Sequence, residues 1–362
     1  MPSPCNRVIL AAAGSRKTQL IIDGALEAPG RRTLITTYTT ENLAQITRRL
    51  QEVTGIVPGN ISLLGWFSFL VNQAARPYQA ALIGQIDYIQ SLNFTGQRFH
   101  RTPREQWRRF YFDRDANLYR DGVADFACRV DDASGGAVVR RLAAMYDRIY
   151  IDELQDLVGY DLDFLDRLFQ SGIEIIAVGD PRQHTLSTNN STRNKQYRGA
   201  GLIGWLRKRQ DRCTVETRAE SWRCNQQICD WADAIYPTMT PTKSHNDEWT
   251  GHDGVFTIAR DDVHTYVAKY RPMVLRHSRT TDTMGLPALN FGLSKGSTYD
   301  RVLIFPTKPM LAYLKNSDPA RLKASDRLYV AVTRARHSVT FVVDRRDATY
   351  AMPPPDAELH SG

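Results

Sequence analysis

The chain has 362 residues, of which 42% are hydrophobic and 24% are charged, a composition that excludes a disordered or a fibrous protein. This length exceeds the size at which a single hydrophobic core usually stops growing, so the sequence predicts two domains. The chain has 47 lysines and arginines against 39 aspartates and glutamates, and the net charge of +8 favours a polyanionic partner.

The five cysteines form neither an even disulfide set nor a Cys-x-x-Cys pair, which is typical of a reducing compartment. No apolar run reaches the roughly 18 residues of a membrane-spanning helix. The first residues also lack the apolar region of a secretory signal. We therefore expect a cytoplasmic protein without a membrane segment.

In chain order, apolar runs predict a first set of strands at residues 8–13, 33–38, 148–152 and 173–178. Helices are expected between them, after Lys17, after Thr40 and at 161–169. A second set of strands, at 272–275, 301–305 and 338–343, alternates with helices at 224–235 and 326–334. Strands that alternate with helices indicate parallel sheets, so the sequence predicts an α/β fold.

The domains are predicted at residues 1–208 and 209–350, followed by a disordered tail at 351–362 that contains three consecutive prolines. The interval between a helix predicted at 66–71 and the strand at 148–152 is too long for a simple crossover, so we expect an inserted segment at about 72–145.

Within that insertion, Arg98-Phe-His-Arg101, Arg104 and Trp107-Arg-Arg-Phe-Tyr-Phe112 interleave cations with aromatic side chains. Such a pattern suits contacts with nucleic-acid phosphates and stacking on bases, and Arg108 and Arg109 are its candidate DNA-binding residues. An amphipathic hairpin with a solvated basic face would produce the same pattern, and the sequence leaves both interpretations open.

The segment Ala11-Ala-Ala-Gly-Ser-Arg-Lys-Thr18 lies between the first strand and the first helix. A phosphate-binding loop needs backbone N–H groups at a helix N-terminus, a lysine for the terminal phosphates and a hydroxyl for Mg²⁺. Gly14, Ser15 and Arg16 form the expected loop, and Lys17 and Thr18 supply the last two groups. Arg16 replaces the usual glycine, which hinders close approach or a special φ. The alternative is a small-residue turn with an incidental lysine.

The apolar strand Arg148-Ile-Tyr-Ile is followed directly by two acidic residues, Asp152 and Glu153. We expect Asp152 to anchor Mg²⁺ and Glu153 to act as a general base on water during phosphoryl transfer. Two solvated strand-end carboxylates are the alternative, and the Gln155 and Asp156 that follow at once argue against it. A second buried strand ends in Gly179-Asp-Pro-Arg-Gln183, in which Gln183 is placed to sense the terminal phosphate.

Several ordered segments resemble the motifs of UvrD/Rep-type superfamily 1 helicases. Asp152–Asp156 resembles motif II and Val178–Gln183 resembles motif III. The further matches are Thr36–Thr39 (motif Ia), Leu64–Ser68 (motif Ib), Ser221–Asn225 (motif IV), Leu293–Asp300 (motif V) and Leu328–Ala335 (motif VI). The resemblance implies two RecA-like P-loop NTPase domains with an ATP cleft between them.

The resemblance also implies roles for particular residues. Arg223 and Arg334 would reach the γ-phosphate from the second domain, Trp222 would stack on adenine, and Gln183 would couple hydrolysis to DNA. Gln19, Lys295 and Gly296 are further candidate nucleotide-binding positions, and Gln19 stands where the family has an arginine. The implied contacts with single-stranded DNA are Tyr38, Trp66, Tyr197 and Arg198.

By resemblance, the expected activity is ATP-dependent translocation on, or unwinding of, single-stranded DNA in the 3′ to 5′ direction, with ATP and Mg²⁺. The residues do not exclude RNA as the track, and a nuclease or repair protein is the expected protein partner. One alternative is a nucleotide-gated DNA-binding subunit with weak ATPase activity, in which Arg16 distorts the phosphate loop. A small-molecule kinase would explain neither Arg223 and Arg334 nor the acidic motif.

Overall fold

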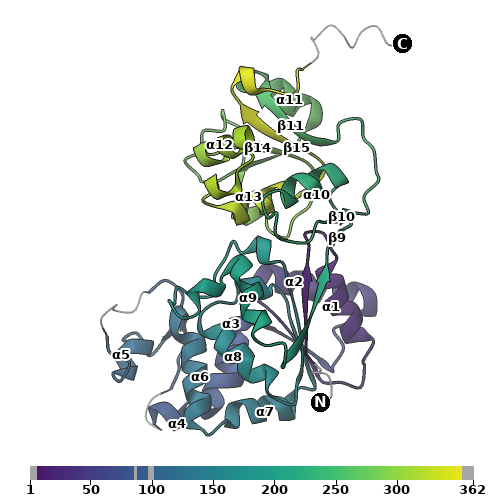
Figure 1. Cartoon of the computed structure of the whole chain (residues 1–362). Coiled ribbons are helices and arrows are strands. Elements are labelled where there is room, and N and C mark those ends of the chain that lie inside the picture. Colours follow the sequence, from purple (N-terminus) through teal and green to yellow (C-terminus); the bar gives the residue numbers. More distant parts are fainter. Residues whose placement is uncertain (1–5, 85–87, 97–101, 353–362) are drawn as a thin grey trace. The chain divides into compact units, whose positions relative to one another are not determined.

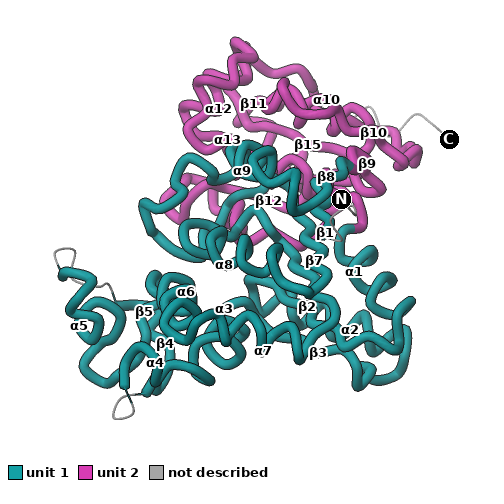
Figure 2. Tube along the Cα trace, turned by 60° about the horizontal axis from the view of Figure 1, so that its bottom comes forward, with its two compact units in different colours: residues 1–10, 17–217 teal, residues 11–16, 218–362 magenta. Residues whose placement is uncertain are grey.

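The computed structural model describes residues 6–84, 88–96 and 102–352, which form two compact units (Figure 2). The first unit comprises residues 1–10 and 17–217, and the second comprises residues 11–16 and 218–362. Two sequence predictions, the basic segment Arg98–Arg101 and the tail from Pro353, lie outside the described residues.

The first unit is built on a six-stranded sheet with the strand order β3-β2-β6-β7-β1-β8. The pairs β3–β2, β2–β6, β6–β7 and β7–β1 are all parallel. The strands are β1 (Asn6–Ala11), β2 (Thr33–Thr37), β3 (Ile61–Gly65), β6 (Arg148–Ile151), β7 (Glu174–Gly179) and β8 (Cys213–Arg218). In a parallel sheet the carboxyl ends of the strands meet at one edge, and the candidate residues after β1, β2, β6 and β7 follow that edge.

Helices cover both faces of this sheet, with α1 and α2 on one face and α3 and α8 on the other (Figure 1). The central strands are therefore buried on both faces, which explains their continuous apolar runs. The helices of this unit are α1 (Lys17–Leu26), α2 (Thr40–Thr54), α3 (Trp66–Ser68), α4 (Ala80–Ile83), α5 (Trp107–Tyr111), α6 (Val123–Ala133), α7 (Ala137–Met145), α8 (Tyr160–Phe169) and α9 (Leu202–Arg207). A π-helical segment, Phe69–Ala75, follows α3.

Between the π-helical segment and β6, the short strands β4 (Leu92–Asn93) and β5 (Leu118–Tyr119) pair in parallel. Helix α5 lies between them in the chain and carries the exposed Arg108 and Arg109. Buried residues of α5 and α6, such as Tyr111 and Phe126, belong to the same hydrophobic core as the central strands.

The second unit contains a five-stranded parallel sheet with the order β11-β15-β14-β12-β13. Alternate residues of β14 face opposite sides, since Val302 and Ile304 pack with α10, α12 and α13 whereas Leu303 and Phe305 pack with α11. The elements are β9 (Glu220–Ser221), α10 (Gln226–Asp233), β10 (Lys243–Ser244), β11 (Gly254–Ala259), α11 (Val263–Tyr270), β12 (Met273–Arg276), β13 (Leu289–Asn290), β14 (Tyr299–Phe305), α12 (Lys308–Asn316), α13 (Ser325–Val332) and β15 (Ala335–Val343).

The predicted α/β class is confirmed, because each unit contains a parallel sheet with helices on both faces. The helix predicted at 66–71 is confirmed, although only α3 is α-helical and the helix continues from Phe69 as the π-helical segment. Strands β3, β8 and β11 and helices α11 and α12 were not predicted. Within the described residues, no helix has both the length and the apolar character needed to cross a bilayer.

Candidate functional site

The loop after β1 turns sharply into helix α1. Gly14 and Arg16 both have left-handed backbones, with φ of 77° and 60°, and α1 begins at Lys17. The first turn of a helix leaves backbone N–H groups without intrahelical partners, and these groups favour an anion. Arg16 thus adopts the left-handed conformation that glycine adopts most easily. The side chain of Arg16 does not prevent this special φ, which the sequence analysis had left open.

Gly14 is required for space as well as for its backbone angle. A Cβ at this position would lie 2.6 Å from Oγ of Ser221 and 2.7 Å from Cβ of Arg223. The carbonyl of Gly14 also accepts a 3.0 Å hydrogen bond from the backbone N–H of Trp222. Because residues 11–16 belong to the second unit, these contacts join the loop to the motif IV segment within that unit.

Trp222 lies against two other side chains of the second unit. The guanidinium carbon of Arg16 is 4.9 Å from a Trp222 ring centroid, and the ring of His245 stacks on Trp222 at 4.5 Å with an interplanar angle of 14°. Gln19 donates a 2.7 Å hydrogen bond to Asp23 along α1. Arg16 therefore supplies the cation next to the aromatic ring.

Three buried hydroxyls at the loop and at the end of β2 have no hydrogen-bond partner in the described part of the chain, those of Ser15, Thr36 and Thr37. A buried hydroxyl without a partner is costly, and a phosphate oxygen is an acceptor that can satisfy it. The unpartnered hydroxyl of Ser15 is therefore a donor in the loop that a phosphate oxygen would satisfy. No group of three or more His, Cys, Asp or Glu able to hold a metal occurs among the described residues. Mg²⁺ there would draw most of its ligands from phosphate and water.

Asp152 and Glu153 follow β6 at the carboxyl edge of the first sheet. Asp152 is 4% exposed, and its backbone N–H donates a 2.9 Å hydrogen bond to the carbonyl of Thr36. Glu153 has a left-handed φ of 57°, and its carboxylate accepts hydrogen bonds from Nδ2 of Asn42 at 3.3 Å and from Nε2 of Gln155. A left-handed non-glycine residue persists only where its surroundings fix it, which often occurs at functional sites.

Gln155 connects the end of β6 to the end of β7. Its Oε1 accepts a 3.0 Å hydrogen bond from the backbone N–H of Asp180, while its Nε2 donates to Glu153. Oδ1 of Asp180 accepts a 2.9 Å hydrogen bond from Nε of Arg182, and Oδ2 accepts a 2.9 Å hydrogen bond from Nε2 of Gln183. Gln183, the predicted phosphate sensor, is therefore held in a buried network with the predicted base.

The pKa of Asp180 reports a positive charge from the phosphate loop. Burial acts to raise this pKa, but the charges of Arg182 and Lys17, together with hydrogen bonds from Arg182 and Gln183, lower it overall. Asp180 therefore stays ionised although it is 1% exposed. The first unit thus brings Lys17, Glu153 and Gln183 into one electrostatic and hydrogen-bonded network.

Three of the residues predicted to contact nucleic acid are partly buried and form hydrogen bonds within the first unit. Tyr38 is partly buried, and its hydroxyl donates a 3.2 Å hydrogen bond to the carbonyl of Ser187. The hydroxyl of Tyr197 accepts a 2.9 Å hydrogen bond from Lys208, which lowers the pKa of Tyr197. Arg198 donates a 2.8 Å hydrogen bond to the carbonyl of Ser191.

Trp66 is 1% exposed, so its ring has no surface on which a base can stack. Its Nε1 donates a 2.6 Å hydrogen bond to Oδ1 of Asp161. Oδ2 of Asp161 accepts from Nδ2 of Asn189 at 2.9 Å and from Oγ1 of Thr188. The DNA contact predicted at Trp66 is therefore replaced by a structural role, in which Asp161 ties α3 and α8 to the loop after motif III.

Arg223 and Arg334 lie close together in the second unit. Arg223 donates a 3.1 Å hydrogen bond to the carbonyl of Thr333, the residue before Arg334. Arg334 is 2% exposed and donates to the carbonyls of Val330 at 3.2 Å and Ser297 at 3.3 Å. Burial lowers the pKa of Arg223, but a guanidinium keeps its proton at neutral pH.

Ser297 follows the predicted positions Lys295 and Gly296, and Gly296 has a left-handed φ of 88°. The contact between Ser297 and Arg334 therefore joins the motif V loop to motif VI. The predicted residues thus form two groups, one in each unit. Lys17, Thr18, Asp152, Glu153 and Gln183 belong to the first unit, and Arg16, Trp222, Arg223, Lys295, Gly296 and Arg334 belong to the second.

Comparison with known proteins gives structural matches only. No family model and no curated protein sequence matches the chain. A crystal structure of arterivirus nonstructural protein 10 (helicase) matches with 14% sequence identity and a TM-score of 0.48, covering 93% of this chain and 59% of that chain. The same helicase in complex with DNA matches with 15% identity and a TM-score of 0.49, covering 93% and 61%. The chain thus spans about three fifths of the helicase it matches.

The left-handed backbone at Arg16 predicts a difference between two substitutions. Both Arg16→Gly and Arg16→Ala remove the cation beside Trp222, but only alanine retains the cost of a left-handed Cβ. We expect the glycine variant to be more stable than the alanine variant by about 1 kcal/mol, measured by denaturant unfolding. Equal stabilities, or a less stable glycine variant, would contradict the left-handed conformation.

Asp161 predicts a pH dependence of stability. Burial raises the pKa of Asp161 to about 6, so the folded state holds a proton that the unfolded state has already lost. Stability from this group is complete below its unfolded pKa and is lost as the pH rises through 6, by up to about 3 kcal/mol.

The Asp161→Asn variant should lack this part of the pH dependence. The measurement is the free energy of unfolding of both proteins from pH 4.5 to 7.5. The wild-type value should fall relative to the variant value up to about pH 6 and run parallel to it above. A constant difference across the range would show that Asp161 titrates normally.

Proposed function

We propose that the chain is an ATP-dependent motor on single-stranded DNA, a translocase or helicase that moves 3′ to 5′. The observation that carries the proposal is that Gln155 links Glu153 to Asp180 at the carboxyl edge of the first sheet, where the charge of Lys17 also acts on Asp180. ATP hydrolysis by this class of site needs a cation for the phosphates and a fixed carboxylate for the attacking water. The ordered motifs shared with superfamily 1 helicases supply the link to nucleic acid.

In the proposed reaction, Lys17 and the N–H groups that open α1 bind the phosphates of ATP. Thr18 and Asp152 would hold Mg²⁺, which supplies positive charge to the β- and γ-phosphates when bound. Glu153 orients the attacking water and accepts its proton, with its carboxylate held by Asn42 and Gln155. Gln183, bonded to Asp180, senses the terminal phosphate.

The second unit contributes charge and stacking. Arg223 and Arg334 would stabilise the charge that develops on the transferring phosphoryl group, for which a planar and permanently charged guanidinium is well suited. Trp222 would stack on the adenine base of ATP. Arg16 would supply the cation beside it, because Gln19 stands where the resembled family has an arginine. Lys295 and Gly296 complete the proposed nucleotide contacts.

Hydrolysis would change the grip of each unit on the strand in turn, and this alternation moves the motor. Tyr38, Tyr197 and Arg198 are the proposed contacts in the first unit, together with the exposed Arg108 and Arg109. Translocation and ATP hydrolysis are the core of the proposal, and a nuclease or repair protein would be the partner in duplex unwinding.

Glu153 gives the test of hydrolysis. Glu153→Gln keeps the shape of the side chain but removes the base, so we expect the DNA-stimulated kcat to fall at least 100-fold while ATP binding changes little. Lys17→Ala should weaken ATP binding itself. Steady-state ATP hydrolysis and equilibrium nucleotide binding measure the two effects separately.

The matched control is Glu27→Gln, which alters an exposed carboxylate of the same unit and should leave both quantities unchanged. Wild-type turnover no faster than that of Glu153→Gln, with nucleotide binding intact, would support the nucleotide-gated binding subunit instead.

Arg108 and Arg109 test the nucleic-acid track. If each neutralises one phosphate, replacing either by alanine should reduce the slope of log affinity against log salt by about 0.7 for single-stranded DNA. Arg48→Ala, an exposed arginine of α2, serves as control and should keep the wild-type slope. If all three variants share that slope, the basic face of α5 is only solvated.

A further inference from the structure

A segment between α10 and β11 contacts motif IV, which contains Arg223, and the residue that follows motif VI, which contains Arg334. We call residues 243–253 the strap. It begins as β10, which pairs in parallel with β9 so that Ser244 lies opposite Ser221. The pairing continues as the backbone N–H of His245 donates a 2.7 Å hydrogen bond to the carbonyl of Ser221. The strap therefore starts as an added strand beside the motif IV segment.

The side-chain amide of Asn246 in the strap contacts Arg223 of motif IV and Arg336, which follows motif VI. Its Nδ2 donates a 2.8 Å hydrogen bond to the carbonyl of Arg223 and a 3.1 Å hydrogen bond to the carbonyl of Arg336. Its Oδ1 accepts a 3.2 Å hydrogen bond from the backbone N–H of Glu248. Both polar atoms of this side chain are thus used, and two of its three bonds join motif IV to Arg336, the second residue of β15, directly after motif VI.

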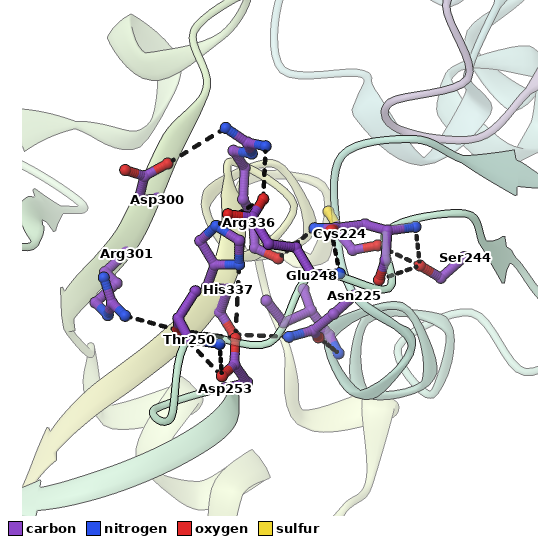
Figure 3. Close-up of polar contacts among 12 residues, drawn as sticks. Cys224, Asn225, Ser244, Glu248, Thr250, Asp253, Asp300, Arg301, Arg336 and His337 are labelled. Atoms are coloured by element: carbon purple, nitrogen blue, oxygen red, sulfur yellow. Dashed lines mark hydrogen bonds and ion pairs between the residues drawn. The ribbon is translucent and has the colours of Figure 1, made fainter.

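A second connection between the two motifs runs beside the first. The backbone N–H of Asn225 donates a 3.1 Å hydrogen bond to the carbonyl of Arg336, and its Nδ2 donates a 2.7 Å hydrogen bond to the carbonyl of His337 (Figure 3). Its Oδ1 caps α10 by accepting from the backbone N–H of Ile228. Asn225 and Asn246 therefore hold the same stretch of β15 against motif IV from two directions.

The other end of the strap lies against Arg336 and His337 of β15. His337 is 3% exposed and lies between two carboxylates, with Nε2 at 3.7 Å from Glu248 and Nδ1 at 3.5 Å from Asp253 (Figure 3). Arg336 pairs with the same Glu248 at 3.1 Å. The carboxylate of Asp253 also accepts a 2.8 Å hydrogen bond from the backbone N–H of Thr250. The strap is thus held at β10 and at Glu248, on either side of Asn246.

We propose that Asn246 is a positioning residue, which holds the backbone of Arg223 against the motif VI segment so that Arg223 and Arg334 act as one rigid pair. This inference rests on the proposed function, because it assigns Asn246 a role through the two arginines. Groups that stabilise a transition state are effective only if they are oriented before the reaction. The side chain of Arg223 is long and flexible. Because Asn246 fixes the backbone carbonyl of Arg223, it restricts the positions that the guanidinium can occupy.

The position of Asn246 separates this role from ordinary core packing. Its side chain is only partly buried, and the neighbouring Asp247, Glu248 and Trp249 are exposed. Substitution there opens no cavity in the hydrophobic core, so a large loss of stability is not expected. A change at Asn246 should instead appear in the step that needs the two arginines.

Three substitutions grade the number of donors at this site. Asn246→Asp keeps the shape but has no donor and places a carboxylate against two carbonyls. Asn246→Ala removes the group, and Asn246→Ser keeps one donor. We expect the DNA-stimulated kcat to fall about tenfold for alanine and more for aspartate, with serine between alanine and the wild type. The KM for ATP and the thermal midpoint should change little.

The matched control is Asn316→Asp, which makes the same chemical change at an exposed asparagine of α12 whose amide bonds only within its own helix. It should retain wild-type kcat. A double-mutant cycle then tests the route of action. If Asn246 works through Arg223, adding Asn246→Asp to Arg223→Ala should cause no further loss of kcat.

Wild-type kcat in Asn246→Asp, or losses that multiply fully in the double variant, would overturn the positioning role while leaving the proposed function intact. A thermal midpoint that falls in step with kcat, so that the two losses cannot be separated, would also overturn it. Wild-type turnover no faster than that of Lys17→Ala would overturn the proposed function, and the positioning role with it.

Discussion

The side-chain amide of Gln155 fixes the carboxyl edge of the first sheet. It donates to Glu153 after β6 and accepts from the backbone N–H of Asp180 after β7, so one buried group bridges two neighbouring strand ends. The amide fits because Gly179 has no Cβ, since an added Cβ would lie 2.5 Å from Oε1 of Gln155. A buried amide that is bonded at both its nitrogen and its oxygen has a restricted orientation, and that orientation holds the proposed base.

Local contacts explain how two unfavourable backbone conformations persist, one at this edge and one in the second unit. Glu153 and Arg16 are both left-handed without being glycine, and each costs about 1–2 kcal/mol relative to an ordinary conformation. The hydrogen bonds of Asn42 and Gln155 hold Glu153, while Trp222 lies beside Arg16. Strain maintained in this way aims a side chain that a relaxed backbone would direct elsewhere.

The α/β class could be predicted because it depends on local pattern. Buried parallel strands read as continuous apolar runs, and strand ends bring acid and glycine to one edge. Strand β8 was not predicted because four of its six residues are polar or charged, namely Thr214, Glu216, Thr217 and Arg218. In addition, only its first residue is buried. Its assignment depends on pairing at the sheet edge, which a single sequence does not encode locally.

The predicted site failed where the answer depended on tertiary contacts. An aromatic residue in a motif gives no sign of its exposure, so the burial of Trp66 against Asp161 could not be foreseen. Gln155 and Asp180 carried a signal, since both stand inside quoted motifs. Asn42 and Asn246 carried none, because each meets its partner only after distant segments have packed together.

The contrast between two arginines near the end of motif VI shows why the strap bears on function. Arg336 pairs with Glu248 and Asp300, so its charge is largely cancelled where it lies. Arg334 donates instead to the carbonyls of Val330 and Ser297. The carbonyls orient the Arg334 guanidinium by accepting its hydrogen bonds. The arginine that anchors the strap and the arginine proposed to act on phosphate are thus different residues of one short segment, so holding that segment in place positions both.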